Sequence, residues 1–145
     1  MPRPRRCGSL RDKSLARVKI VNWTATSAIL LALAVALGAF GAHGLQGRLD
    51  AYSLGVYEKA VFYHFIHALG MLAVPLLVRA GLISESTGKW TGWLLLSGIV
   101  LFSGSLYLLA ITGVRTLGAI TPFGGVSFIA AWVVLAICAL RSRGH

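Results

Sequence analysis

Four long stretches without a charged side chain constrain the fold of this chain more than any other feature. Their lengths are 28, 19, 25 and 25 residues, and they cover residues 20–47, 60–78, 90–114 and 116–140. A helix needs about 20 mostly apolar residues to cross the hydrocarbon of a bilayer. The sequence therefore predicts an all-α integral membrane protein with four spans, at about 22–42, 58–79, 90–112 and 117–140.

The composition leaves little chain for anything else. Hydrophobic residues make up 57% of the 145 residues and charged residues only 12%, against about 25% charged residues in an ordinary soluble domain. A soluble catalytic domain is thereby excluded. The connections between the spans are short, which favours antiparallel neighbours and an up-down four-helix bundle.

Basic residues predict the orientation. Seven of the fourteen lie in the first 19 residues, directly before the first span. With four spans, the N-terminus, the 79–89 loop and the C-terminus share one side with eleven basic residues, against three on the other. The positive-inside rule then places both termini in the cytoplasm, with residues 1–21 as a basic tail, expected to be disordered, and 141–145 as a second tail.

Other interpretations of the basic start are weaker. It imitates a cleaved signal peptide, but the first uncharged stretch is about twice as long as the apolar region of such a peptide. Mitochondrial targeting is a second alternative. Nucleic acid is not expected as a partner, since no aromatic side chain precedes Trp23 to stack on bases. Trp23, Trp90 and Trp93 are all expected at the cytoplasmic headgroup level, where indole rings concentrate.

Small residues indicate where helices pack closely. Ala34, Gly38 and Ala42 recur every fourth position of the first span, and such a stripe lets another helix approach. Pro122, Gly124 and Gly125 interrupt the start of the fourth span, where proline removes a helix donor. Either Thr121 caps a short fourth span, which we favour, or the helix is broken just inside the membrane.

Polar side chains concentrate in the half of the spans away from the termini. On the second span one helical face carries Tyr57, Ala60, His64, His67, Met71 and Pro75, and the opposite face carries Phe62, Ile66, Leu69 and Ala73. The histidine face should point into the bundle. Counting 1.5 Å per residue from the outer helix ends places six polar residues at one depth. This predicted layer contains His43, His64, His67, Ser103, Tyr107 and Thr121.

Such a layer has several possible roles. The simplest is a hydrogen-bond network that fixes helix packing, with bonds worth about 0.6–2 kcal/mol each. A metal or haem site is the sharper hypothesis, because imidazole ligates Zn, Cu and haem iron, and its candidate ligands are His43, His64 and His67. Proton or quinone handling and a pore rank lower, since no acidic residue lies deep in a span. No Ser-His-acid set or phosphate-binding loop is present.

Four segments carry a family resemblance. They are residues 38–45 (GAFGAHGL), 63–69 (YHFIHAL), 101–107 (LFSGSLY) and 118–125 (GAITPFGG). In this order they resemble the YgdD/YwdK-type family of small bacterial inner-membrane proteins, which has a eukaryotic branch and no established activity. The resemblance covers about 22–140 and implies a four-span protein of the bacterial cytoplasmic membrane. The long basic start departs from the family, so either it is an addition in this lineage or translation starts further on, for instance near Val18.

Together these observations favour a non-enzymatic accessory or interaction subunit without catalytic residues and without a cofactor. Its expected partners are the lipid bilayer and, through small-residue stripes, another membrane protein or a second copy. A metal, haem or redox protein that uses the histidines is the alternative, and a component of a small-molecule transporter is the third hypothesis.

Overall fold

The computed structural model describes residues 22–142, all of whose regular structure is helical. The predicted N-terminal tail and all but the first two residues of the C-terminal tail lie outside this range. Two of the elements, η1 and η2, are π-helical turns, and η3 is a 3₁₀ turn. The order is α1 (Trp23–Phe40), η1 (Gly41–Leu45), α2 (Ala51–Arg79), α3 (Glu85–Gly98), η2 (Ile99–Ser103), α4 (Gly104–Thr112), η3 (Arg115–Ala119) and α5 (Thr121–Ser142).

Four continuous helical segments are long and apolar enough to cross a membrane, as predicted. They are Trp23–Leu45, Ala51–Arg79, Glu85–Thr112 and Arg115–Arg141. The second, third and fourth segments are longer than the uncharged stretches from which they were predicted, and polar side chains cap the second and third at Asp50 and Ser84. The second helix begins seven residues, and the third five residues, before the predicted start of its span.

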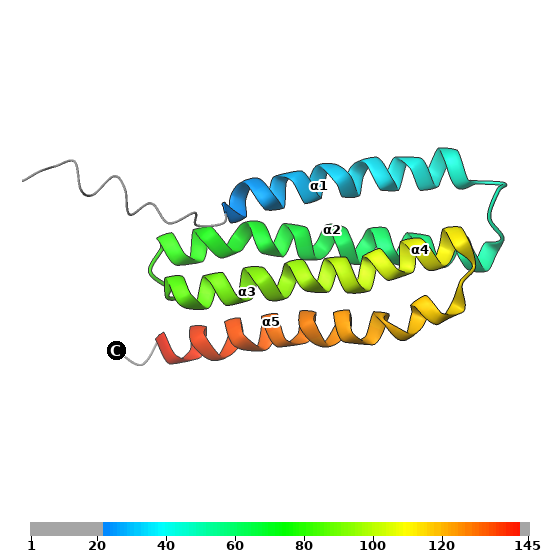
Figure 1. Ribbon diagram of the computed structural model, residues 1–145. Coiled ribbons are helices and arrows are strands. Elements are labelled where there is room, and N and C mark those ends of the chain that lie inside the picture. Colours follow the sequence, from blue (N-terminus) through cyan, green and yellow to red (C-terminus); the bar gives the residue numbers. More distant parts are fainter. Residues whose placement is uncertain (1–21, 143–145) are drawn as a thin grey trace, which may run out of the picture.

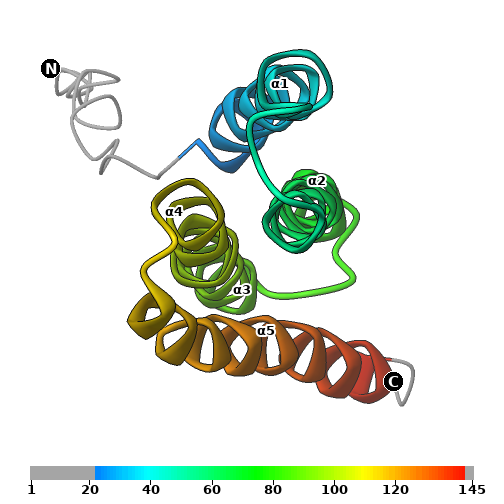
Figure 2. The same ribbon diagram turned by 90° about the vertical axis from the view of Figure 1, so that its right-hand side faces the viewer.

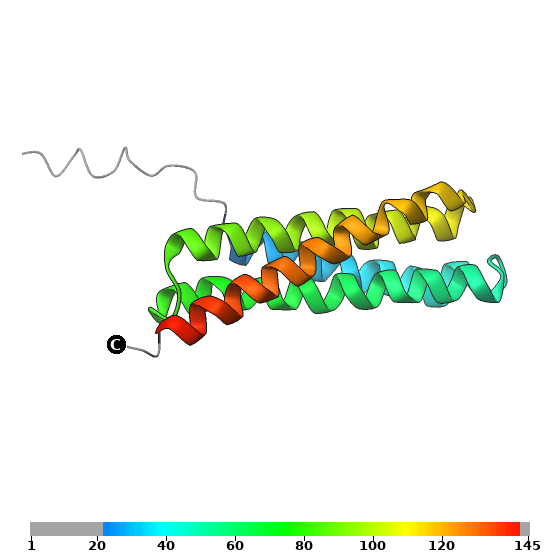
Figure 3. The ribbon, with the colours of Figure 1, turned by 90° about the horizontal axis from the view of Figure 1, so that it is seen from below.

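The helices alternate in direction, and α1 begins at the same end of the molecule at which α5 finishes (Figure 1). They do not form a square bundle. Viewed end-on, α1 and α5 lie on opposite sides of a central pair made by α2 and the α3–η2–α4 segment (Figure 2). From below, α5 crosses this pair obliquely (Figure 3). These alternating directions are those of the expected up-down bundle, and the helices form three layers, since α1 packs on α2 whereas α5 packs on α3 and η2.

The two faces of α2 are as predicted. Tyr57, Ala60, His64, His67 and Met71 are buried. Phe62, Ile66 and Leu69 are exposed large apolar side chains, which suit lipid. A helical period of 3.6 is thus sufficient to orient this helix correctly.

Glycines opposite aromatic rings set the distances between the helices. A Cβ on Gly92 would lie 2.5 Å from the Trp23 ring, and one on Gly98 would lie 2.4 Å from the Phe128 ring. Trp23 is accordingly only 7% exposed, with its ring edge-on to Trp93 at 5.4 Å. Trp23 is the first residue of α1, and Gly92 opens a space for its indole inside the fold.

The predicted small-residue stripe is largely used inside the chain. Ala34 is fully buried, and a Cβ on Gly38 would lie 3.3 Å from Val61 of α2. Only Ala42 is exposed. The stripe therefore brings α1 onto α2 of the same chain, and Ala34 is not available to a second protein.

The fourth span begins with η3 and continues as α5 from Thr121. Pro122 is the second residue of α5, where a missing N–H costs no helical bond. The hydroxyl of Thr121 hydrogen-bonds to that of Ser105 at 2.8 Å. The favoured start at Thr121 is correct, but its hydroxyl joins two spans and does not replace a backbone bond.

Asp50 caps α2, as expected, with the Ser53 amide donating to its carboxylate at 2.7 Å. This backbone bond, with a side-chain bond from Ser53, lowers the pKa of Asp50. A lowered pKa means that the cap stabilises the helix above the ordinary carboxyl pKa of about 4 and is lost as pH falls through the folded value. The protection of the Ser53 amide against hydrogen exchange, measured relative to the intrinsic rate at each pH, should therefore fall in acid, and in Asp50→Ala this amide should be poorly protected at every pH. An equal pH response in Asp50→Ala would contradict this.

Candidate functional site

The structure separates the predicted polar layer into local pairs. His64 and Tyr107 face each other, and Thr121 pairs with a residue that the prediction lacked. His67 turns toward α5, Ser103 is fully buried, and His43 is exposed on η1. The six residues that were predicted at one depth therefore face different helix interfaces and do not form one continuous network.

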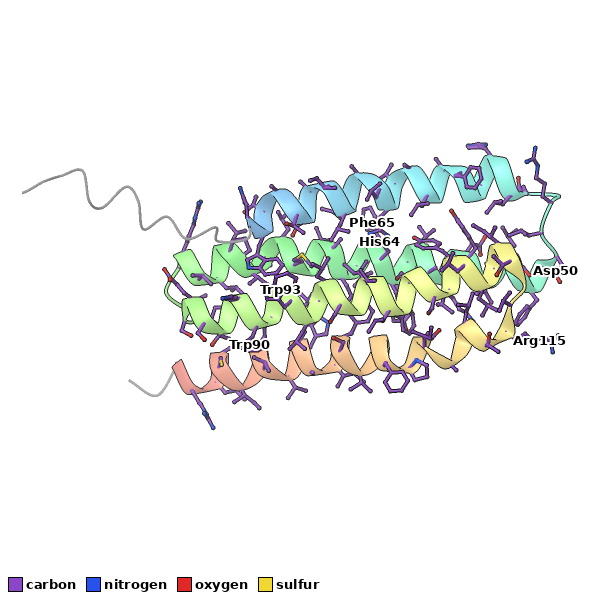
Figure 4. All side chains as sticks on the ribbon, in the orientation of Figure 1. Asp50, His64, Phe65, Trp90, Trp93 and Arg115 are labelled. Carbon is purple, nitrogen blue, oxygen red and sulfur yellow. The ribbon has the colours of Figure 1, made fainter. Side chains whose placement is uncertain are left out.

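The His64 pair is the polar centre of the α2–α4 interface. The Nδ1 atom of His64 lies 3.4 Å from the Tyr107 hydroxyl, so the hydrogen bond between them is long. The Tyr107 ring contacts Tyr57 edge-on at 5.0 Å, and the Tyr57 hydroxyl donates to the Leu37 carbonyl at 2.9 Å. One polar and aromatic chain thus joins α1, α2 and α4. Figure 4 shows His64 in the middle part of α2, far from Asp50 at its start.

His67 belongs to a different interface. Its Nδ1 donates to the Tyr63 carbonyl at 2.7 Å, which is bonding within one helical turn. Its ring stacks on Phe128 of α5, with centroids 3.4 Å apart. The side chain is 7% exposed and serves mainly as a flat packing surface between α2 and α5.

Two pairs of hydroxyl side chains join the third span to the fourth. Ser105 bonds Thr121, and the Ser97 hydroxyl lies 2.7 Å from that of Ser127, which also donates to the Leu94 carbonyl at 2.8 Å. Sequence reasoning missed Ser97, Ser105 and Ser127. Isolated hydroxyl residues on two apolar spans were the available signal, since hydroxyls in membranes commonly bond between helices.

Three buried polar atoms have no hydrogen-bond partner among the described residues. They are His64 Nε2, Thr91 Oγ1 and Ser103 Oγ. Within residues 22–142 no three His, Cys, Asp or Glu side chains are grouped to hold a metal ion. His64 and His67 face different interfaces and His43 is exposed, so the triple-histidine arrangement on which the metal hypothesis rested is not assembled.

A groove of about 400 Å³ lies between α1 with η1 and α2, on the outside of the bundle. Gly38, Gly41 and Ala42 form one wall, and α2 supplies the other. A Cβ on Gly41 would lie 2.7 Å from the Tyr57 ring, so glycine is required for this close approach. The α2 wall consists of Tyr57, Glu58, Val61, Phe62, Phe65 and Ile66. Figure 4 shows Phe65 on α2, below the middle of α1. Glu58 is the only charged residue of the lining.

We expect His64 and Tyr107 to be energetically coupled by about 0.6 kcal/mol, the usual size of a hydrogen bond between membrane helices. A double-mutant cycle with His64→Ala and Tyr107→Phe measures this coupling as the departure from additivity in unfolding free energy. The control cycle combines His64→Ala with a substitution of Tyr52, which is exposed in the first turn of α2. Additive effects in both cycles would contradict the bond.

These features define a class: a helical membrane protein with four helices able to span the bilayer, a hydrogen-bonded interior and a lateral groove. Residues 37–125 match the family described as "Protein of unknown function (DUF423)". The chain belongs to this family, as its four motif segments indicated.

Its relatives are named as membrane proteins. The chain is 49% identical to the UPF0382 membrane protein YwdK of Bacillus subtilis over 116 residues, which cover 79% of this chain and 92% of the relative. A UPF0382 membrane protein of Staphylococcus epidermidis is 53% identical over 115 residues, 77% of this chain and 89% of the relative. No solved structure matches the chain significantly.

Proposed function

We propose that this protein is a non-enzymatic component of the bacterial cytoplasmic membrane that binds another membrane constituent along the α1–α2 groove. The observation that carries the proposal is the groove itself. Its walls combine small residues of α1 and η1 with aromatic and aliphatic side chains of α2, and it opens to the side of the bundle. Packing is the main attraction between apolar groups in a bilayer, so a concave surface offers more contact than a flat helix face.

The interior supports a non-catalytic role. Several of its hydroxyls bond across the helix interfaces, as those of Tyr57, Ser105 and Ser127 do. Such bonds fix the register of helices. This arrangement suits a rigid scaffold that presents a lateral surface.

Both termini are proposed to lie in the cytoplasm, because the end of the molecule where α1 begins carries most basic residues. A fluorescent protein that folds only in the cytoplasm, fused after residue 145, should fluoresce. Alkaline phosphatase at the same site should be inactive, and the reverse pattern would overturn the orientation.

The groove is tested by photo-crosslinking in native membranes. A photoreactive amino acid at Ala42, in the groove, should give a discrete adduct with a lipid or protein, resolved by mass spectrometry. The control position is Val35, which is 60% exposed on α1 and outside the groove. Adducts of the same kind and yield at both positions would mean that the groove binds nothing selectively.

Metal analysis separates our proposal from the metal alternative. On our proposal, protein purified gently from its native membrane should be close to metal-free and lack a haem absorbance band, in the wild type and in His64→Ala and His67→Ala. Near-stoichiometric metal that both substitutions remove would replace our proposal with a cofactor site.

A further inference from the structure

The carboxylate of Glu58 indicates what the groove binds. We propose that its occupant is a phospholipid whose headgroup carries a primary ammonium, with an acyl chain along the groove and the ammonium at Glu58. This inference rests on the proposed function and specifies the partner. Three features support this occupant: the depth of Glu58, its lack of a partner within residues 22–142, and the shape of the groove below it.

Depth follows from the length of α2. From Glu58 to Arg79 the helix has 21 steps, or about 32 Å at 1.5 Å per residue. The hydrocarbon core of a bilayer is about 30 Å thick, and residues 60–78 between these charges carry none. Glu58 and Arg79 therefore lie at the two boundaries of the hydrocarbon, and Glu58 is level with lipid headgroups.

No other described residue neutralises Glu58. No ion pair or side-chain hydrogen bond involves its carboxylate within residues 22–142, and the residue is exposed. In the part of the chain that the structure describes nothing competes for this carboxylate, so it is available to a cationic group at headgroup level. Since Glu58 lines a groove that opens sideways, that group can come from the lipid.

The rest of the groove suits an acyl chain. Beyond Glu58 its α2 wall continues inward through Val61, Phe62, Phe65 and Ile66, all apolar, and its opposite wall has no side chain larger than methyl. Its volume of about 400 Å³ lies within the range of ordinary ligand pockets. Lys59, exposed and next on the helix, adds a positive charge at phosphate level. A carboxylate beside a lysine complements a headgroup that carries both phosphate and ammonium.

A second copy or a partner helix is the competing occupant, and crosslinking between two protein copies would reveal it. Anionic lipids without an amine are disfavoured by repulsion from Glu58. A choline headgroup carries charge but no N–H to donate.

The test uses the full chain in phosphatidylcholine vesicles doped with photoactivatable phosphatidylethanolamine, phosphatidylglycerol or phosphatidylcholine of the same acyl chains. Labelling of peptides containing residues 38–42 and 57–66 is measured by mass spectrometry. We expect phosphatidylethanolamine to label them about two- to fivefold more than the others, the effect of one exposed ion pair. Glu58→Gln should abolish the preference and Glu58→Asp should retain it. Glu85→Gln, at an exposed carboxylate on α3, should not affect it.

Filling the groove separates this inference from the proposed function. Ala42→Trp should lower labelling by all three lipids, whereas Val35→Trp should not. Equal labelling by all lipids that Ala42→Trp still suppresses would overturn the headgroup assignment and leave the groove as a binding surface. Crosslinking of two protein copies through the groove would also overturn it. Equal effects of Ala42→Trp and Val35→Trp would overturn both proposals.

Discussion

Replacing Gly124 with alanine is expected to destabilise the folded protein by about 3 kcal/mol, at the upper end of what overpacking usually costs. A Cβ at this position would lie 2.3 Å from the backbone nitrogen of Phe102 and 2.8 Å from its Cα. A flexible side chain could turn away from the new methyl group, but a backbone cannot. The helices α5 and η2 would have to separate, which would loosen the Ser105–Thr121 and His67–Phe128 contacts between the same layers.

The adjacent glycine gives the control. A Cβ on Gly125 would lie 3.7 Å from the Phe102 ring, which is an ordinary contact. Gly125→Ala should therefore be neutral or slightly stabilising, since alanine favours the helix. Free energies of unfolding in mixed detergent micelles compare the two variants. Equal stability of Gly124→Ala and Gly125→Ala would contradict the backbone contact.

Periodicity and charge predicted the membrane spans because both depend on local composition. The 3.6-residue repeat in α2 separated buried His64 and Met71 from lipid-facing Phe62 and Leu69. The sequence also predicted one helix cap correctly, at Asp50. These features require no knowledge of which helices touch.

The arrangement of the layers depends on pairings that no local pattern encodes. Gly92 receives Trp23, and Gly124 meets the backbone of Phe102 from a distant part of the sequence. The π turns at Gly41–Leu45 and Ile99–Ser103 were also missed. Each adds a residue to a helical turn and so rotates the side chains that follow, which disturbs any depth or face count made at 3.6 residues per turn.

This rotation also explains the fate of the candidate site. Tyr107 follows η2 and still meets His64, because both lie near one helix interface. His43 lies inside η1 and is exposed on the outside of the bundle. Depth alone therefore brought His64 and Tyr107 together correctly, but it could not show which helix interface each of the other polar residues faces. The groove was not predicted, although Gly38 and Ala42, which line it, had been singled out for packing.

Phe128→Ala is the second large effect we expect, at about 2 kcal/mol. Phe128 is 3% exposed, fills the space left by Gly98 and stacks on His67. Truncating a buried phenylalanine costs about 3–5 kcal/mol in water-soluble proteins. In a bilayer the separated helices leave this side chain in lipid and not in water, so the transfer contribution is small and the lost packing dominates.

Phe123 tests that reasoning on the same helix, because its side chain is 70% exposed toward lipid. Phe123→Ala should change the unfolding free energy by less than about 0.5 kcal/mol, as surface substitutions do. A cost for Phe128→Ala as large as in soluble proteins would mean that its unfolded state exposes this segment to water. A cost no greater than that of Phe123→Ala would mean that α5 does not pack on α2 through His67 and Phe128. The intermediate value is expected because both helices stay in the bilayer when their contact is lost.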